Sequence, residues 1–182
     1  MSSQLKYGVL SGLVLGVVLF LTMFMQPAEI DMNNPFAGAN ASGGILLWFF
    51  KTGVLFTLFF LAAKEVRDNQ LGGYISFGKA FGVSYVTGLY TILVYVIVAA
   101  IYYYVFNPDW FPMNWDQFAE TMEENANGQD IEQSLKFMKM WFDNITLITL
   151  GGIAIGNLIG MAILSLVIGG VVQKDDPDHV NL

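Results

Sequence analysis

The residues of this sequence most able to do chemistry are acids gathered between residues 116 and 124. They are Asp116, Glu120, Glu123 and Glu124. Three of them recur every fourth residue, which places them on one side of a helix. Grouped carboxylates suit a divalent cation or acid–base work. The same spacing equally describes the solvated side of a helix whose opposite side carries Trp115, Phe118 and Met122. We favour the solvated side, because no nucleophile, phosphate-binding glycine loop or second acid cluster accompanies these acids.

Other kinds of reactive site are limited by composition. The chain has no cysteine and one histidine, His179, which excludes disulfides, cysteine-ligated zinc and a histidine-based catalytic triad within one copy. The formal net charge of −7 disfavours nucleic acid as a partner, because phosphate contacts need clustered lysine and arginine. We therefore predict no catalytic residue, no metal and no cofactor, and a protein that is not an enzyme.

One cation, Lys51, lies within an otherwise apolar stretch. Ionisable groups within a membrane are candidates for function, so Lys51 could contact a substrate or an ion. It could instead extend its four-carbon stem toward the nearer interface, which is the interpretation we favour. Asp143 is a hypothetical ion-pair partner, because it stands at a matching depth before the last apolar stretch.

These groups have to be positioned by four long apolar segments. The chain is 55% hydrophobic and 13% charged, and its apolar residues form blocks at about residues 7–25, 45–63, 80–106 and 145–172. A helix of about 20 apolar residues crosses the hydrocarbon core of a bilayer, whereas barrel strands are about half as long and alternate with polar residues. Residues 1–182 are therefore predicted to form a single all-α domain, an integral membrane four-helix bundle. The first block lacks a signal-peptide cleavage site and is expected to be retained.

The two longer connections differ in character. Residues 26–44 are rich in proline, asparagine and glycine, and predict an irregular loop. Residues 113–142 predict an external amphipathic segment, either two helices or one helix broken at Asn127-Gly128. This segment could lie on the membrane surface or cap the bundle.

Basic residues near the span ends predict orientation. Lys6, Lys64, Arg67, Lys79 and Lys174 fall on one side of a four-span protein. The connection between the third and fourth spans is acidic. Because cytoplasmic loops carry the excess of lysine and arginine, both termini are predicted to be cytoplasmic.

Glycine repeats predict how the spans pack. Gly8, Gly12 and Gly16 recur every four residues in the first span, and Gly152, Gly156 and Gly160 do so in the fourth. Such a face lets another helix backbone approach closely, either in a homo-oligomer or within one chain. We favour packing within the chain and expect the first and fourth spans to be neighbours. Asn157 is expected to hydrogen-bond to another helix.

Three runs resemble a known bacterial family, the domain of unknown function 4199. The runs are Leu5–Gly12, Gly72–Phe81 with Ser76, Phe77, Gly78 and Lys79, and Ile101–Phe111 with Asn107, Pro108 and Asp109. The resemblance covers nearly the whole chain. It implies a small four-span protein of the bacterial cytoplasmic membrane, and it carries no activity or catalytic residue that could be transferred.

Two main functions fit these observations. The first is a non-enzymatic membrane module that assembles with or regulates a membrane-protein partner. The second is a small oligomeric transporter or channel component, for which Ser84, Thr87 and Thr91 would supply a thin polar stripe. A membrane enzyme that uses the external carboxylates ranks below both.

Overall fold

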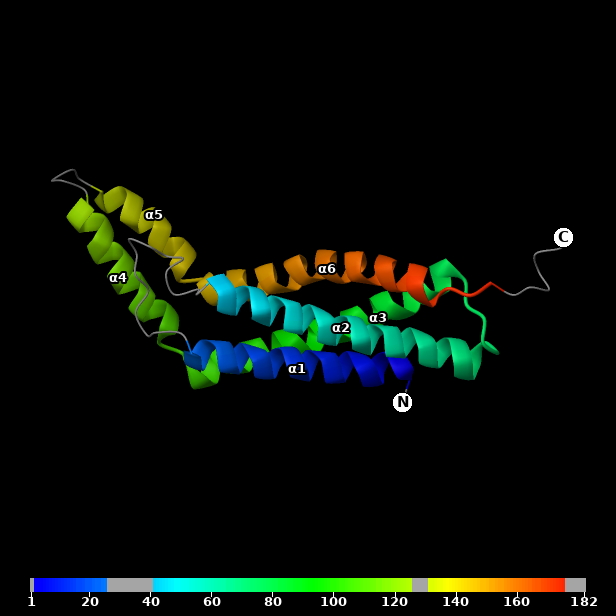
Figure 1. The fold of residues 1–182 in the computed structure, drawn as a ribbon. Helices are drawn as coiled ribbons and strands as arrows, with labels where there is room; N and C mark the ends of the chain where they lie inside the picture. The colour runs from blue at the N-terminus through cyan, green and yellow to red at the C-terminus, as the bar shows by residue number, and fades with distance from the viewer. Residues whose placement is uncertain (1, 26–40, 126–130, 176–182) are drawn as a thin grey trace.

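A computed structural model describes residues 2–25, 41–125 and 131–175, which form helices almost throughout (Figure 1). The elements in chain order are α1 (Ser3–Met25), α2 (Ala41–Gln70), α3 (Phe77–Ile101), the π-helical turn η1 (Tyr102–Phe106), α4 (Trp110–Asn125), α5 (Glu132–Phe142) and α6 (Ile145–Val172). The predicted all-α fold is confirmed. The predicted loop at 26–44 lies mostly outside the described residues, but Ala41 to Gly44 already belong to α2.

Four helical stretches are long and apolar enough to cross a membrane. They are Ser3–Thr22, Leu46–Gln70, Phe77–Phe106 and Leu147–Val172. Each corresponds to one predicted span, although the second continues seven residues past its predicted end at residue 63. In lipid, a continuous helix satisfies every backbone group within the segment, so apolar stretches of this length form helices end to end.

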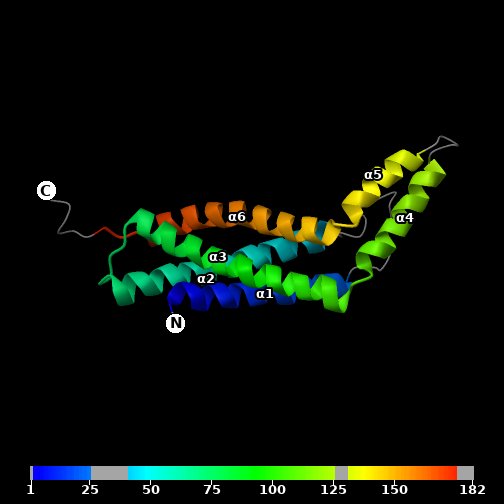
Figure 2. The same cartoon turned by 180° about the vertical axis from the view of Figure 1, so that it is seen from behind.

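The four long helices run alternately up and down, so both termini lie at one end of the bundle (Figures 1 and 2). We name this the basal end, and the end that carries α4 and α5 the distal end. The α3 helix is central, with its most extensive packing against α1 and α6, while α2 crosses the bundle and contacts all three. The expectation that the first and fourth spans are neighbours is wrong, because α1 and α6 each pack extensively against α3 rather than against one another.

The core lies mainly where α2, α3 and α6 meet toward the basal end. Its fully buried members include Phe59, Ala63, Ala80 and Ile168. A smaller distal cluster joins α1 to the end of α3, where the Phe20 ring meets the Tyr102 ring edge to face at 5.1 Å. The bundle is therefore packed along α3, and its other helices expose much of their apolar surface, as expected for a protein whose solvent is hydrocarbon.

The distal end projects a two-helix hairpin. The third span closes in η1, where the Asn107 amide N–H donates to the Tyr102 carbonyl at 2.9 Å and the Asn107 side-chain amide donates to the Tyr102 hydroxyl at 3.1 Å. The chain then forms α4 and α5, which pack together and lean away from the bundle axis (Figure 2). The segment is therefore two helices. The predicted break at Asn127-Gly128 lies outside the described residues.

Candidate functional site

The glycine repeat of α1 is buried against α3. A Cβ added at Gly8 would lie 2.5 Å from the Tyr90 Cβ, and one added at Gly12 would lie 2.6 Å from the Val94 Cβ. At Gly16 the nearest atom would be a methyl group of Val98 at 2.6 Å. Real side chains do not tolerate such distances, so the α1–α3 contact requires glycine here. The prediction of packing within the chain holds for this repeat.

The glycine repeat of α6 has the same spacing and a different environment. A Cβ added at Gly152, Gly156 or Gly160 would meet no atom within 4 Å. The isoleucines that follow the same side of the helix, Ile155 and Ile159, are more than 60% exposed. The side of α6 that carries these glycines is therefore open in the single chain, and we call it the α6 glycine face.

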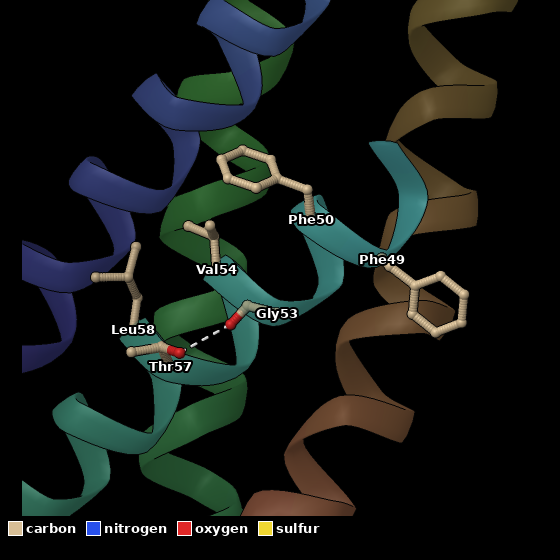
Figure 3. A pocket seen from close by; sticks show the side chains of 6 residues that line it. All are labelled: Phe49, Phe50, Gly53, Val54, Thr57 and Leu58. Atoms are coloured by element: carbon tan, nitrogen blue, oxygen red, sulfur yellow. Dashed lines mark hydrogen bonds between the residues drawn. The ribbon is translucent and has the colours of Figure 1, made fainter. Parts of the chain in front are cut away.

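A second open surface lies on the distal half of α2. Trp48, Phe49 and Phe50 are each more than half exposed. Beside them an open groove of about 360 Å³ is formed around Gly53, a glycine with no atom within 4 Å of an added Cβ. Figure 3 shows Phe49 and Phe50 directed to different sides of α2, with the Thr57 hydroxyl donating to the Gly53 carbonyl at 2.9 Å. We call this surface the α2 aromatic face.

Lys51 lies between the residues of the α2 aromatic face and is partly buried. The predicted ion pair with Asp143 is not formed. The ion pairs among the described residues are Lys6–Glu65, Arg67–Asp68 and Lys136–Glu132. Asp143 is exposed at the distal end, whereas Lys51 is partly buried.

The three acids predicted to share one side of a helix, Asp116, Glu120 and Glu124, lie on α4 and are exposed, as is the neighbouring Glu123. Across residues 2–25, 41–125 and 131–175, no three histidine, cysteine, aspartate or glutamate side chains converge to hold a metal ion. Asn157 also differs from expectation, because its side-chain amide donates to the Ile153 carbonyl of its own helix at 2.7 Å. An intrahelical acceptor four residues back satisfies the amide without a partner helix.

The family-like run at residues 72–81 organises the basal end. Gly72 and Gly73 adopt positive φ values of 66° and 94°, a conformation that favours glycine, and reverse the chain after α2. Ile75 then exchanges both backbone hydrogen bonds with Lys174, at 3.0 and 2.9 Å. The Phe77 ring lies against Gly169, where an added Cβ would be 3.1 Å away. This run therefore ties the start of α3 to the end of α6.

Further contacts fasten the basal end. The Arg67 guanidinium donates to the Val172 carbonyl at 3.3 Å, and the Ser3 hydroxyl donates to the Glu65 carboxylate at 3.1 Å. Lys6 reaches the same carboxylate at 3.4 Å. These contacts join α2 to α1 and to α6, so polar groups cross-link the basal end. Glu65 and Arg67 lie beyond residue 63, where the second span was predicted to end.

Buried hydroxyls follow the central helix. Ser84, Thr87 and Thr91 of α3 are fully buried, and both threonines donate to the carbonyl four residues earlier. The hydroxyls of Ser84 and Ser165 have no hydrogen-bond partner. The α3–α6 register, with Phe77 against Gly169 and Gly88 against Met161, places these two serines at one level. Ser84 was among the residues named from the sequence, whereas Ser165 was not. The available signal for Ser165 was its small size among large apolar neighbours.

These features define a class of protein: a multi-pass, all-helical membrane protein with two open intramembrane faces. The chain belongs to the family described as protein of unknown function DUF4199, whose model matches residues 6–174. This confirms the resemblance seen in the sequence. No curated protein and no solved structure matches the chain.

Proposed function

We propose that this protein is a non-enzymatic module of the bacterial cytoplasmic membrane that binds a transmembrane helix of a partner membrane protein. The α6 glycine face is the principal contact, and the α2 aromatic face is an additional one. The observation that carries the proposal is the contrast between the two glycine repeats. The repeat of α1 is filled by α3, whereas the repeat of α6 is open.

The physical argument concerns what glycine contributes in a membrane helix. Glycine costs about 1 kcal/mol relative to alanine in a helix interior, so an open repeat weakens α6 with no return in the isolated chain. Close backbone approach restores that energy through dispersion and weak Cα–H···O contacts. A partner helix supplies this approach along the whole repeat, as α3 does for α1.

The composition of the α2 aromatic face favours a protein partner over lipid alone. Its groove is lined by Phe49, Phe50, Val54, Thr57 and Leu58 around Gly53, and most of these side chains are apolar. Aromatic side chains around a small-residue gap are the common anchors of protein interfaces. Its distal position also brings Lys51 to the edge of the contact, where it would meet an acidic group of the partner.

The alternative is a small oligomeric transporter or channel in which a second copy occupies the α6 glycine face. Its sequence support was the glycine repeats and Lys51. The thin polar stripe that a pore would need, Ser84, Thr87 and Thr91, is buried between helices of one chain. A conducting path would therefore have to form between copies. An enzyme acting through the exposed acids of α4 ranks last, because those acids do not converge.

Site-specific crosslinking in native membranes tests the proposal. A photocrosslinking residue is placed at Ile155 or Ile159 on the α6 glycine face, and at Leu93 of α3 as a control, since Leu93 is equally exposed. We expect a defined foreign adduct from α6 and none from Leu93. The Gly156→Leu change should abolish the adduct, whereas Gly170→Leu, at another open glycine of α6, should preserve it.

The outcomes separate the two functions. A foreign adduct that depends on Gly156 supports the module, whereas only self-adducts favour the oligomeric channel. Equal labelling from Ile155 and Leu93 contradicts both, because it means that lipid covers the α6 glycine face.

The orientation forms part of the proposal and has its own test. The basal end carries Lys6, Lys64, Arg67, Lys79 and Lys174, so we place it in the cytoplasm. Because the chain has no cysteine, single cysteines at Gln70 and Glu123 can be compared directly. An impermeant maleimide applied to spheroplasts should label Glu123→Cys, and should label Gln70→Cys only after permeabilisation. The reverse pattern would invert the topology.

A further inference from the structure

Four charged side chains gather at the basal end, where α2 meets the end of α6. The Arg67 Nε donates to the Asp68 carboxylate at 2.8 Å, and the same guanidinium donates to the Val172 carbonyl at 3.3 Å. The charges of Lys64 and Lys174 act on the same carboxylate. We call Lys64, Arg67, Asp68 and Lys174 the basal charge cluster. It holds three cations and one anion, so it carries an excess of positive charge.

The cations of this cluster differ in what they bind. Arg67 is only partly exposed, and its guanidinium is engaged within the bundle. Lys64 and Lys174 are exposed, and neither forms an ion pair with a carboxylate in the part of the chain that the structure describes. The Lys174 ammonium lies 5.2 Å from the centre of the Tyr74 ring, beside the backbone bridge between Ile75 and Lys174. Two ammonium groups around one neutralised carboxylate are therefore available to a further anion.

The cluster lies at the level where the apolar part of α2 ends. Leu61, Lys64 and Asp68 follow one side of α2 at spacings of three and four residues, and all three are exposed. This side of the helix therefore changes from apolar to charged within about two turns. On α6, the exposed Val171 precedes Lys174 in the same order. A molecule with an apolar chain beside Leu61 would bring a polar head to the cluster.

This arrangement fits an anionic phospholipid. Lysine and arginine at a bilayer surface attract anionic headgroups, whereas the positive group of a zwitterionic headgroup would meet the same cations. A free anion would use the cations but not the exposed apolar residues beside them. The exposed acid Asp175 follows the bridge, where the chain leaves the helices (Figure 1), so it lies beyond the level of Lys64 and Leu61.

We propose that the basal charge cluster binds the phosphate of an anionic phospholipid in the leaflet at the basal end, with an acyl chain against Leu61. Lys64 and Lys174 bind the phosphate oxygens. Arg67 neutralises Asp68, so that the carboxylate does not repel the headgroup. The lipid joins the end of α2 to the end of α6 beside the hydrogen bond from Arg67 to Val172. The site depends neither on the proposed partner of the α6 glycine face nor on the orientation of the protein.

The test uses the purified full chain in detergent micelles with equal amounts of phosphatidylglycerol and phosphatidylcholine. Native mass spectrometry measures how much of each lipid is retained. We expect several-fold more phosphatidylglycerol than phosphatidylcholine. The double variant Lys64→Gln, Lys174→Gln should remove this preference. The control double variant Lys79→Gln, Lys136→Gln removes the same charge at exposed positions outside the cluster, and should keep it.

Three results would overturn the proposal. The first is equal retention of the two lipids by the unaltered chain. The second is an equal loss of preference in both double variants, because total charge and not the cluster would then govern retention. The third is displacement of phosphatidylglycerol by inorganic phosphate, because the site would then bind a phosphate without an acyl chain. Only this chain is present, so another protein cannot supply the retained lipid's contacts.

A single variant tests the cluster in the opposite direction. Asp68→Asn removes the one anion of the cluster, and Arg67 keeps its hydrogen bond to the Val172 carbonyl. Retention of phosphatidylglycerol should therefore rise, whereas a fall would contradict the proposal. This variant also keeps the proposal testable if the double lysine variant does not fold. Circular dichroism in micelles without phospholipid checks the fold of each variant.

Discussion

The α1 and α6 helices carry the same glycine repeat and use it differently. In α1, an added Cβ would fall within 2.6 Å of α3 at every repeat position, whereas in α6 the corresponding positions meet nothing within 4 Å. Both helices pack on α3, but α6 does so with Met161, Ser165 and Ile168, on the side away from its repeat. A glycine repeat therefore marks a surface capable of close approach. Whether that surface is occupied depends on which neighbour the bundle places there.

The largest loss of stability is expected from a substitution in the glycine repeat of α1, which packs against α3. Gly12→Leu would force a side chain into Val94 and into the Thr91 carbonyl, and backbone cannot move aside as a flexible side chain can. We expect a loss of about 3 kcal/mol or more in the free energy of unfolding, because overpacking of this kind separates the helices. Unfolding in mixed detergent, followed by circular dichroism, measures it.

The matched change in the open repeat sharpens the comparison. Gly156→Leu should not lower the free energy of unfolding and should raise it by up to about 1 kcal/mol, because the new side chain enters empty space and the helix loses an unfavourable glycine. Equal destabilisation by Gly12→Leu and Gly156→Leu would end the distinction between the two repeats.

A smaller loss of stability is expected from a substitution at Gly169, near the end of α6. At Gly169 an added Cβ would lie 3.1 Å from the Phe77 ring, a contact that a modest ring rotation relieves. Gly169→Leu should therefore cost about 1 to 2 kcal/mol. Its neighbour Gly170 has open space, and Gly170→Leu should be close to neutral in the same unfolding measurement. A neutral Gly169→Leu would mean that the Phe77 contact does not hold α6 to α3.

On the packed side of α6, one substitution is expected to raise the free energy of unfolding rather than lower it. The Ser165 hydroxyl is fully buried with no hydrogen-bond partner, so Ser165→Ala should raise the free energy of unfolding by about 1 kcal/mol. Ser11 of α1 is the control, because its hydroxyl donates to the Tyr7 carbonyl at 2.7 Å. Ser11→Ala should give no gain. Destabilisation by Ser165→Ala would show that its hydroxyl is engaged in the membrane.

The smallest effect is expected at Lys51. No ion pair of the described residues involves Lys51, so Lys51→Met should change the free energy of unfolding by no more than about 0.5 kcal/mol. The cysteine-labelling rate at position 143 should also stay the same. A large change in either would restore the predicted pair with Asp143.

Much of the fold was predictable, and the site was predictable only in part. The four long apolar helices, the helical connection between the third and the fourth, and the family were all indicated by the sequence and are confirmed. The predicted neighbours were wrong, because apolar helices of equal length have no sequence signal for adjacency in lipid. Asn157 was also assigned the wrong acceptor, since a helix offers a carbonyl four residues back. The partner, the orientation and the absence of enzymatic activity stay predictions.

The sequence by itself determined that this chain is helical and that four of its helices are long and apolar enough to span a membrane. Apolar segments of this length have to pair their peptide groups internally when no water is present. Only the tertiary structure decided that α3 is the central helix, that it fills the α1 repeat, and that the α6 repeat is left open. Spacing sets how closely a helix can be approached, and the arrangement of all four helices sets what approaches it.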